Sequence, residues 1–108
     1  MGKYLIYRKE ILMPAYLIVR MNVTDMEQYK EYMKLSPDIL KKYGGKFIIR
    51  GAEKLILEGP EVTDRMVMVK FDSVEDAQKM YNSDEYQAAI EVRKDAATGS
   101  FIVMEGLE

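Results

Sequence analysis

The sequence predicts an α+β fold in which four strands and two helical regions follow one another in the order βαββαβ. Three observations lead to this prediction. Short apolar segments are typical of strands, and two of them run directly into segments with helical periodicity. A residue suited to helix capping, Thr24 or Ser73, stands at each of these transitions. A tyrosine, Tyr32 or Tyr81, follows eight residues later in both halves, so the chain contains a weak internal repeat.

The first half of this repeat consists of one strand and one long helical region. Alternating apolar residues predict a strand over residues 15–23. Thr24 with Glu27 forms a capping-box pattern at the start of the helical region. Ser36-Pro37 interrupts the apolar stripe, either as a kink or as the cap and first residue of a new helix. Gly44-Gly45 ends the region, because a glycine readily adopts the left-handed conformation.

Two apolar segments follow the glycine pair. KFIIRG and EKLILEG, residues 46–51 and 53–59, are predicted to form two short strands or one bent strand around Gly51. RMVMVKFD, residues 65–72, is predicted to be the next strand of the sheet.

The second half repeats the helical pattern and closes with a strand. Ser73 is the expected cap of one helix, and Ser83 is the expected cap of a second helix that runs to Gly99. SFIVMEG, residues 100–106, is the expected closing strand.

Right-handed crossovers place the helices on one face of an antiparallel sheet, which is the ferredoxin-like arrangement. The other face lacks the polar residues of a sheet that faces water. On the closing strand, Phe101 and Val103 point to one side while Ile102 and Met104 point to the other. An apolar second face needs a cover, and a copy of the same sheet is the simplest one. We therefore expect a homodimer joined through its sheet faces.

The composition excludes several classes of site. The chain has 108 residues, which suits a single domain over residues 14–108, and its net charge is −2 with scattered basic residues. Binding to nucleic acid or membrane is therefore not expected. The chain has no cysteine, which fits a reducing cytoplasm, and no histidine, which removes the commonest base and metal ligand. No cofactor or metal motif is present, so we expect an activity that needs neither.

Residues 1–13 precede a second candidate start at Met13-Pro14. Arg8, Lys9 and Glu10 can be encoded by purine-rich codons that resemble a bacterial ribosome-binding site. Two interpretations stay open. Residues 1–13 are an N-terminal extension from a mis-assigned start, or KYLIYR forms an extra strand.

Arg93 is the first candidate site residue. It shares one helical face with Tyr86 and Ile90, which predicts that it points inward. A buried guanidinium stays charged and needs an anion or carbonyl groups around it. Arg93 can hold a ligand carboxylate. Alternatively, it pairs internally, for example with Glu58 or Glu105, or its aliphatic part packs on the core while its guanidinium stays in water.

Arg50 raises the same question on a strand. It lies in an apolar segment, and alternation places Arg20 and Glu58 beside apolar residues in the same way. These three residues form either a polar cluster within a cavity or a salt bridge between strands or across a dimer.

MYNSDEYQ joins the two helices of the second half and supplies the remaining candidates. Asn82 and Ser83 offer hydrogen-bonding groups at a helix start, where free N–H groups favour anions. Tyr81 and Tyr86 offer phenolic hydroxyls. The alternative is a helix break in which Ser83 is only the cap and the tyrosines pack in the core.

Several segments together resemble one bacterial family. YGGKFIIRG, LEG, FDSVEDAQKMYNSDEYQAAIEVRKDA and the closing IVMEG resemble the domain of unknown function thirteen-thirty family, from about Pro14 to Gly106. The resemblance implies a ferredoxin-like protomer of the dimeric α/β-barrel superfamily. It implies no agreed activity, although the superfamily includes cofactor-free monooxygenases and isomerases. Many relatives use histidine, which this chain lacks.

Two hypotheses of different class follow. The first is a cofactor-independent small-molecule enzyme, monooxygenase- or isomerase-like, with a pocket between the sheet and the helices. In this hypothesis Arg93 fixes a small anionic ligand and a tyrosine or Glu58 moves a proton. The second is a non-catalytic module that binds a small ligand or serves as a structural dimer. The expected pocket is lined by Tyr81, Asn82, Ser83, Tyr86 and Arg93, with Arg50 nearby.

Overall fold

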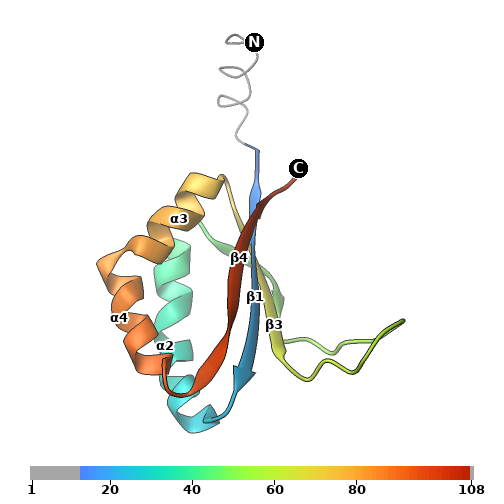
Figure 1. Ribbon diagram of the computed structural model, residues 1–108. Coiled ribbons are helices and arrows are strands. Elements are labelled where there is room, and N and C mark those ends of the chain that lie inside the picture. Colours follow the sequence, from blue (N-terminus) through green and yellow to red (C-terminus); the bar gives the residue numbers. More distant parts are fainter. Residues whose placement is uncertain (1–12, 108) are drawn as a thin grey trace.

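A four-stranded antiparallel sheet covered on one face by three helices makes up the fold (Figure 1). The computed structural model describes residues 13–107, so the two interpretations of the N-terminal extension lie outside the described residues. The strand order β2-β3-β1-β4 confirms the ferredoxin-like fold. The elements are β1 (Ala15–Val23), α2 (Met26–Lys42), β2 (Lys46–Arg50), β3 (Arg65–Phe71), α3 (Val74–Asn82), α4 (Asp84–Arg93) and β4 (Ala97–Glu105).

The start of α2 differs by one residue from the sequence prediction. Asp25, not Thr24, is the N-cap, and its carboxylate accepts a hydrogen bond from the Gln28 amide at 3.1 Å. Thr24 is unavailable because its amide and its hydroxyl both donate to the carbonyl of Ala96, at 2.8 and 3.2 Å. A hydrogen-bond acceptor distant in the sequence, the Ala96 carbonyl, thus prevents Thr24 from forming the predicted capping box.

Proline does not divide the helix. Pro37 lies inside α2, so the predicted alternative of a new helix starting there is wrong. Proline removes one backbone hydrogen bond, but the buried face formed by Tyr29, Tyr32 and Leu40 holds the helix against the sheet. Gly44 has φ +86°, as expected for the residue that ends the helix.

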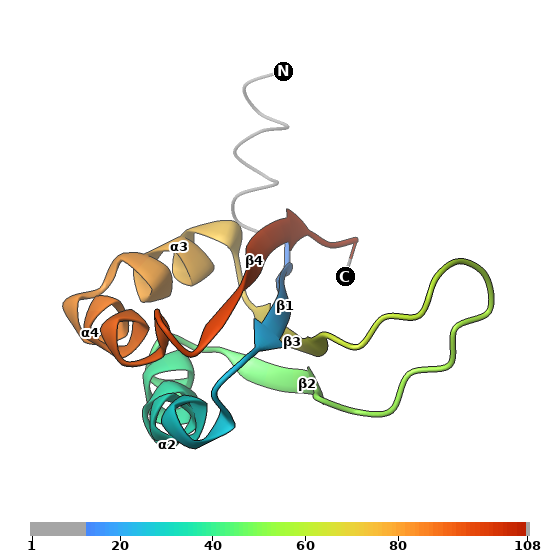
Figure 2. The ribbon, with the colours of Figure 1, turned by 60° about the horizontal axis from the view of Figure 1, so that its bottom comes forward.

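The segment between β2 and β3 is a loop. The chain leaves the sheet after Arg50 and returns at Arg65, so the predicted strand over residues 53–59 is wrong (Figure 2). Gly51, at φ +62°, starts the excursion. Leu55 and Leu57 are 82% and 89% exposed. Strand-like composition alone did not suffice, because a strand also needs a pairing partner and residues 53–59 pair with no described strand.

The last helix is shorter than predicted. It ends at Arg93, not at Gly99, and the chain enters β4 at Ala97. β4 pairs with β1 so closely that a Cβ atom on Gly99 would collide with the Arg20 carbonyl. Pairing with β1 from Ala97 onward therefore accompanies a helix that ends six residues earlier than the local periodicity had favoured.

The two faces of the sheet have different environments. The face toward the helices forms the core, where Leu17, Val69 and Phe71 are fully buried. On the opposite face, Ile102 and Met104 of β4 are 52% and 57% exposed. No helix within residues 13–107 is long and apolar enough to cross a membrane.

Candidate functional site

Described residues of the helices and the sheet line two clefts that concern the predicted site. The first, called the α3 cleft here, lies between α3 and strands β1 and β4 and has a volume of about 560 Å³. The second, called the α2 cleft, lies between α2 and strands β1, β2 and β3 and has room for only about 30 Å³. Leu17 and Phe101 line both clefts and therefore separate them. Of these two clefts, the α3 cleft has room for a metabolite.

The α3 cleft combines apolar walls with a few polar side chains. Met21 of β1, Val103 of β4 and Met80 of α3 belong to its apolar lining. Its polar lining consists of Gln78, Tyr81, Asn82 and Arg93. Among the described residues no carboxylate lines it. Arg93 is therefore the one charged group in the described lining, and the cleft is cationic.

Arg93 is buried where α4 ends. Its side chain is 9% exposed, and its Nε has no hydrogen-bond partner among the described residues. The guanidinium carbon lies 5.3 Å from the centre of the Tyr32 ring and 4.8 Å from that of Phe101. Burial lowers the pKa of Arg93, but the phenols of Tyr86 and Tyr32 outweigh this effect and raise it overall. The guanidinium is thus charged, stacked between rings and incompletely hydrogen-bonded.

A pair of phenols lies beneath Arg93. The hydroxyl oxygens of Tyr32 on α2 and Tyr86 on α4 are 2.6 Å apart, and Tyr86 is fully buried. Burial, and then the neighbouring Tyr32, raise the pKa of Tyr86 far above its usual range. Tyr86 is therefore protonated at neutral pH, where it donates hydrogen bonds and does not serve as a base.

The structure brings some of the predicted site residues together. Arg93, Tyr81 and Asn82 line the α3 cleft, and Tyr86 lies behind it with its ring 5.5 Å from that of Tyr81. Ser83 caps α4 by accepting a hydrogen bond from the Tyr86 amide at 3.2 Å. Ser83 contributes with Asn82 to a shallower neighbouring groove and does not line the α3 cleft.

Two predicted site residues lie elsewhere. Arg50 lines the α2 cleft, and Glu58 is exposed in the loop between β2 and β3. Arg20 pairs with Asp64 at 2.6 Å on the surface. Arg20, Arg50 and Glu58 therefore do not form the polar cluster that alternation allowed.

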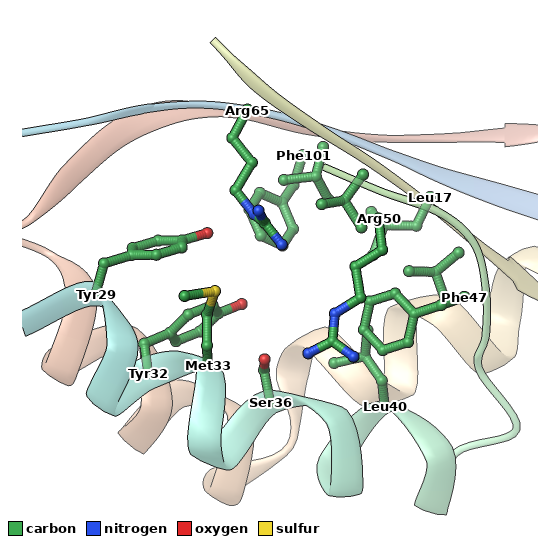
Figure 3. A pocket seen from close by; sticks show the side chains of 13 residues that line it. Leu17, Tyr29, Tyr32, Met33, Ser36, Leu40, Phe47, Arg50, Arg65 and Phe101 are labelled. Carbon is green, nitrogen blue, oxygen red and sulfur yellow. The ribbon is translucent and has the colours of Figure 1, made fainter. Parts of the chain in front are cut away.

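The α2 cleft contains polar residues that the sequence analysis missed. Figure 3 shows Arg65, Ser36 and Tyr29 around the same space as Arg50. Arg65 could have been found, because alternation puts it on the same face as Val67 and the rest of the core-facing side of β3. Ser36 also could have been found, since it continues the buried helical stripe of α2.

Comparison with known proteins identifies the family. A sequence profile described as "Domain of unknown function (DUF1330)" matches residues 14–107. The chain belongs to the DUF1330 family. Among curated proteins the chain has no match.

Solved structures similar to this DUF1330 chain share its fold at low sequence identity. A protein of unknown function from Rhodopseudomonas palustris is 19% identical, with a TM-score of 0.73 over 100% of this chain and 95% of the other. SnoaB, a cofactor-independent oxygenase from Streptomyces nogalater, is 7% identical, with a TM-score of 0.64 over 88% and 94%. A dimeric protein of unknown function from Bacteroides fragilis is 16% identical, with a TM-score of 0.52 over 86% and 96%.

The arrangement in this DUF1330 protein favours binding and polarisation of an anionic ligand. No group of three metal-ligating side chains occurs within the described residues. A guanidinium in an apolar cleft stabilises a carboxylate, an enolate or a phenolate, because water competes poorly there. The phenol of Tyr81, which lines the cleft, can assist as a hydrogen-bond donor.

Proposed function

We propose that this protein is a cofactor-independent small-molecule enzyme, monooxygenase- or isomerase-like, that binds an anionic metabolite in the α3 cleft. The observation that carries the proposal is Arg93, a residue that is 9% exposed, whose Nε lacks a partner among the described residues, and that lines a cleft of about 560 Å³. A buried charge without a counter-ion is costly. An anionic ligand in the cleft supplies the counter-ion.

The roles of the lining residues follow from their chemistry. Arg93 binds the anionic group, and Tyr81 and Asn82 donate hydrogen bonds to neighbouring oxygens of the ligand. Tyr86 is too deeply buried to touch the ligand and positions Arg93 from behind. Glu58 is exposed on a loop, so within one protomer the phenols are the better candidates for handling a proton.

The reaction class rests on the ligand's own reactivity. The described lining has no carboxylate, and histidine is absent from the sequence, so the cleft offers no ordinary base. A substrate that ionises easily, such as a keto-enol or a hydroxyaromatic acid, can enter as the anion that Arg93 stabilises. The likeness to SnoaB, a cofactor-independent oxygenase, supports a reaction of such an anion with oxygen.

The same proposal includes a homodimer in the cytoplasm, joined through the open faces of the sheets. Ile102 and Met104 are more than half exposed on this face. Ile18 of β1 pairs with Ile102 of β4 on one side and with Met68 of β3 on the other. A similar structure from Bacteroides fragilis is dimeric. A specific interface of this kind buries more than about 1,000 Å². The absence of cysteine fits a reducing compartment.

Ligand-dependent thermal stabilisation tests the proposal. A panel of keto acids and hydroxyaromatic acids is screened, and oxygen uptake is then measured with each compound that raises the melting temperature. We expect Arg93→Met to fold and to lose the stabilisation. Arg93→Lys should restore little of it, because an ammonium cannot reproduce the planar fork.

A matched variant controls for the loss of one charge. Lys94→Met removes the adjacent cation, which is exposed and pairs with Glu91 at 3.2 Å on the surface. This variant should bind as the unmodified protein does. If Arg93→Met keeps the full stabilisation by the same compound, the α3 cleft is not its binding site and the proposal is wrong.

A further inference from the structure

We propose that the α2 cleft is a second binding site, which takes a small planar oxyanion such as a carboxylate group between Arg50 and Arg65. The site is separate from the α3 cleft, because the side chains of Leu17 and Phe101 stand between the two. The inference does not depend on the function proposed for Arg93.

The first argument is the convergence of two cations. Figure 3 shows the guanidinium groups of Arg50 on β2 and Arg65 on β3 directed into the same space. Neither forms an ion pair within the part of the chain that the structure describes, and no described carboxylate lines the cleft. Two like charges in a partly closed space repel each other, and an anion between them relieves that repulsion.

The second argument is that both side chains are held in place. The guanidinium carbon of Arg50 lies 4.6 Å from the centre of the Phe47 ring, which orients the group by cation–π contact. Arg65 passes over Gly51, where a Cβ atom would collide with its guanidinium nitrogen. The Arg65 guanidinium thus fills the space that a side chain at residue 51 would take.

The third argument is an unused hydrogen-bond donor. Ser36 is 7% exposed, its oxygen points toward the cleft in Figure 3, and it has no hydrogen-bond partner among the described residues. The hydroxyl of Tyr29 also faces the cleft. Because the Ser36 hydroxyl opens into the cleft, it can donate a hydrogen bond to a bound anion.

The size and geometry of the space define the ligand. A volume of about 30 Å³ admits a group of a few atoms and excludes a metabolite held entirely within it. Guanidinium groups are planar forks that match two oxygens in one plane. A carboxylate fits this description whether it belongs to a free ion, such as formate, or to the end of a larger molecule.

Titration with sodium formate, compared with sodium chloride at equal ionic strength, tests the proposal. We expect formate to raise the melting temperature more than chloride does, and formate binding to weaken about tenfold or more in Arg50→Gln and in Arg65→Gln. Without formate and at low salt, each of these variants should melt no lower than the unmodified protein, because one source of repulsion is gone.

Two control variants make the result specific. Lys41→Gln removes an exposed cation from the end of α2 and should leave formate binding unchanged. Formate binding that is lost in Arg93→Met but kept in Arg50→Gln and Arg65→Gln would assign the anion to the α3 cleft and overturn this proposal. Equal effects of formate and chloride, or undiminished formate binding in Arg50→Gln and Arg65→Gln, would overturn the proposal.

A second titration identifies the source of the carboxylate. Sodium benzoate presents the same group on a larger body. Tighter binding of benzoate than of formate, lost in Arg65→Gln, assigns the site to the end of a larger ligand. Binding of formate alone assigns it to a free small anion.

Discussion

The hydroxyl oxygens of Tyr32 and Tyr86 lie 2.6 Å apart and join α2 to α4 beneath the guanidinium of Arg93. Tyr86 is fully buried and Tyr32 is 6% exposed, so water cannot replace the bond when one partner is removed. The two rings meet edge to face with their centres 6.3 Å apart. This contact ties the two halves of the internal repeat together.

Removing either hydroxyl should destabilise the fold. We expect Tyr86→Phe and Tyr32→Phe each to lower the free energy of unfolding by about 1–3 kcal/mol, because each leaves a buried hydroxyl or guanidinium short of a partner. The double variant should lose less than the sum of the two, since the groups share one bond. Urea denaturation of the four proteins measures the coupling. Tyr81→Phe, whose exposed hydroxyl forms no hydrogen bond within residues 13–107, should change little.

Stability should fall at alkaline pH. Burial raises the pKa of Tyr86 and of Tyr29 above their value of about 10 in the unfolded chain. Below about pH 10 both phenols are protonated in both states, so they contribute no pH dependence. Above it the unfolded chain releases their protons first, and each phenol costs about 1.4 kcal/mol of unfolding free energy per pH unit. In Tyr86→Phe, unfolding above about pH 10 releases one proton fewer, so the unfolding free energy should fall less steeply with pH. An unchanged slope would contradict a raised pKa for Tyr86.

A side chain at Gly51 should disturb the α2 cleft. We expect Gly51→Ala to cost about 1 kcal/mol or more of unfolding free energy, because the residue has φ +62°. The new methyl group also takes the space of the Arg65 guanidinium, so formate binding should weaken. Gly59, at φ +104° and with open space around it, is the matched control. Gly59→Ala should share the backbone strain but not the change in binding.

A charge on the open face of the sheet should dissociate the proposed dimer. Ile102→Lys places an ammonium among apolar side chains, and its burial in an interface is unfavourable. We expect the dimer dissociation constant to rise by about tenfold or more, as followed by light scattering over a dilution series. Ala88→Lys, on an exposed position of α4, should leave the mass unchanged. A monomeric mass for the unmodified protein at micromolar concentration would rule out the interface.

Local sequence determined the elements whose signals are complete within a few residues. Ser73 and Ser83 cap their helices as predicted, since a serine oxygen three residues before an amide needs no distant partner. Gly44 ends α2 for the same local reason. Alternation in β1 and the helical stripe of α2 then sufficed for the order of elements and the ferredoxin-like topology.

Only the tertiary structure decided the features that depend on partners distant in the chain. The amide and the hydroxyl of Thr24 both donate hydrogen bonds to the carbonyl of Ala96. Asp25 is therefore the residue that caps α2. β1 offers a free edge to the chain after Arg93, so β4 forms where helical periodicity continued. Residues 53–59 pair with no strand of the described chain, so they form a loop.

The candidate sites divide in the same way. The sequence by itself placed Arg93 on an inward helical face and put Arg50 in an apolar strand, because side-chain direction follows from periodicity. It did not show that Arg93 would stack on Phe101 of β4, or that Arg65 would share a cleft with Arg50. These two contacts depend on how the helices and strands pack. Packing brings together residues that are far apart in the sequence, and no local pattern indicates such a contact.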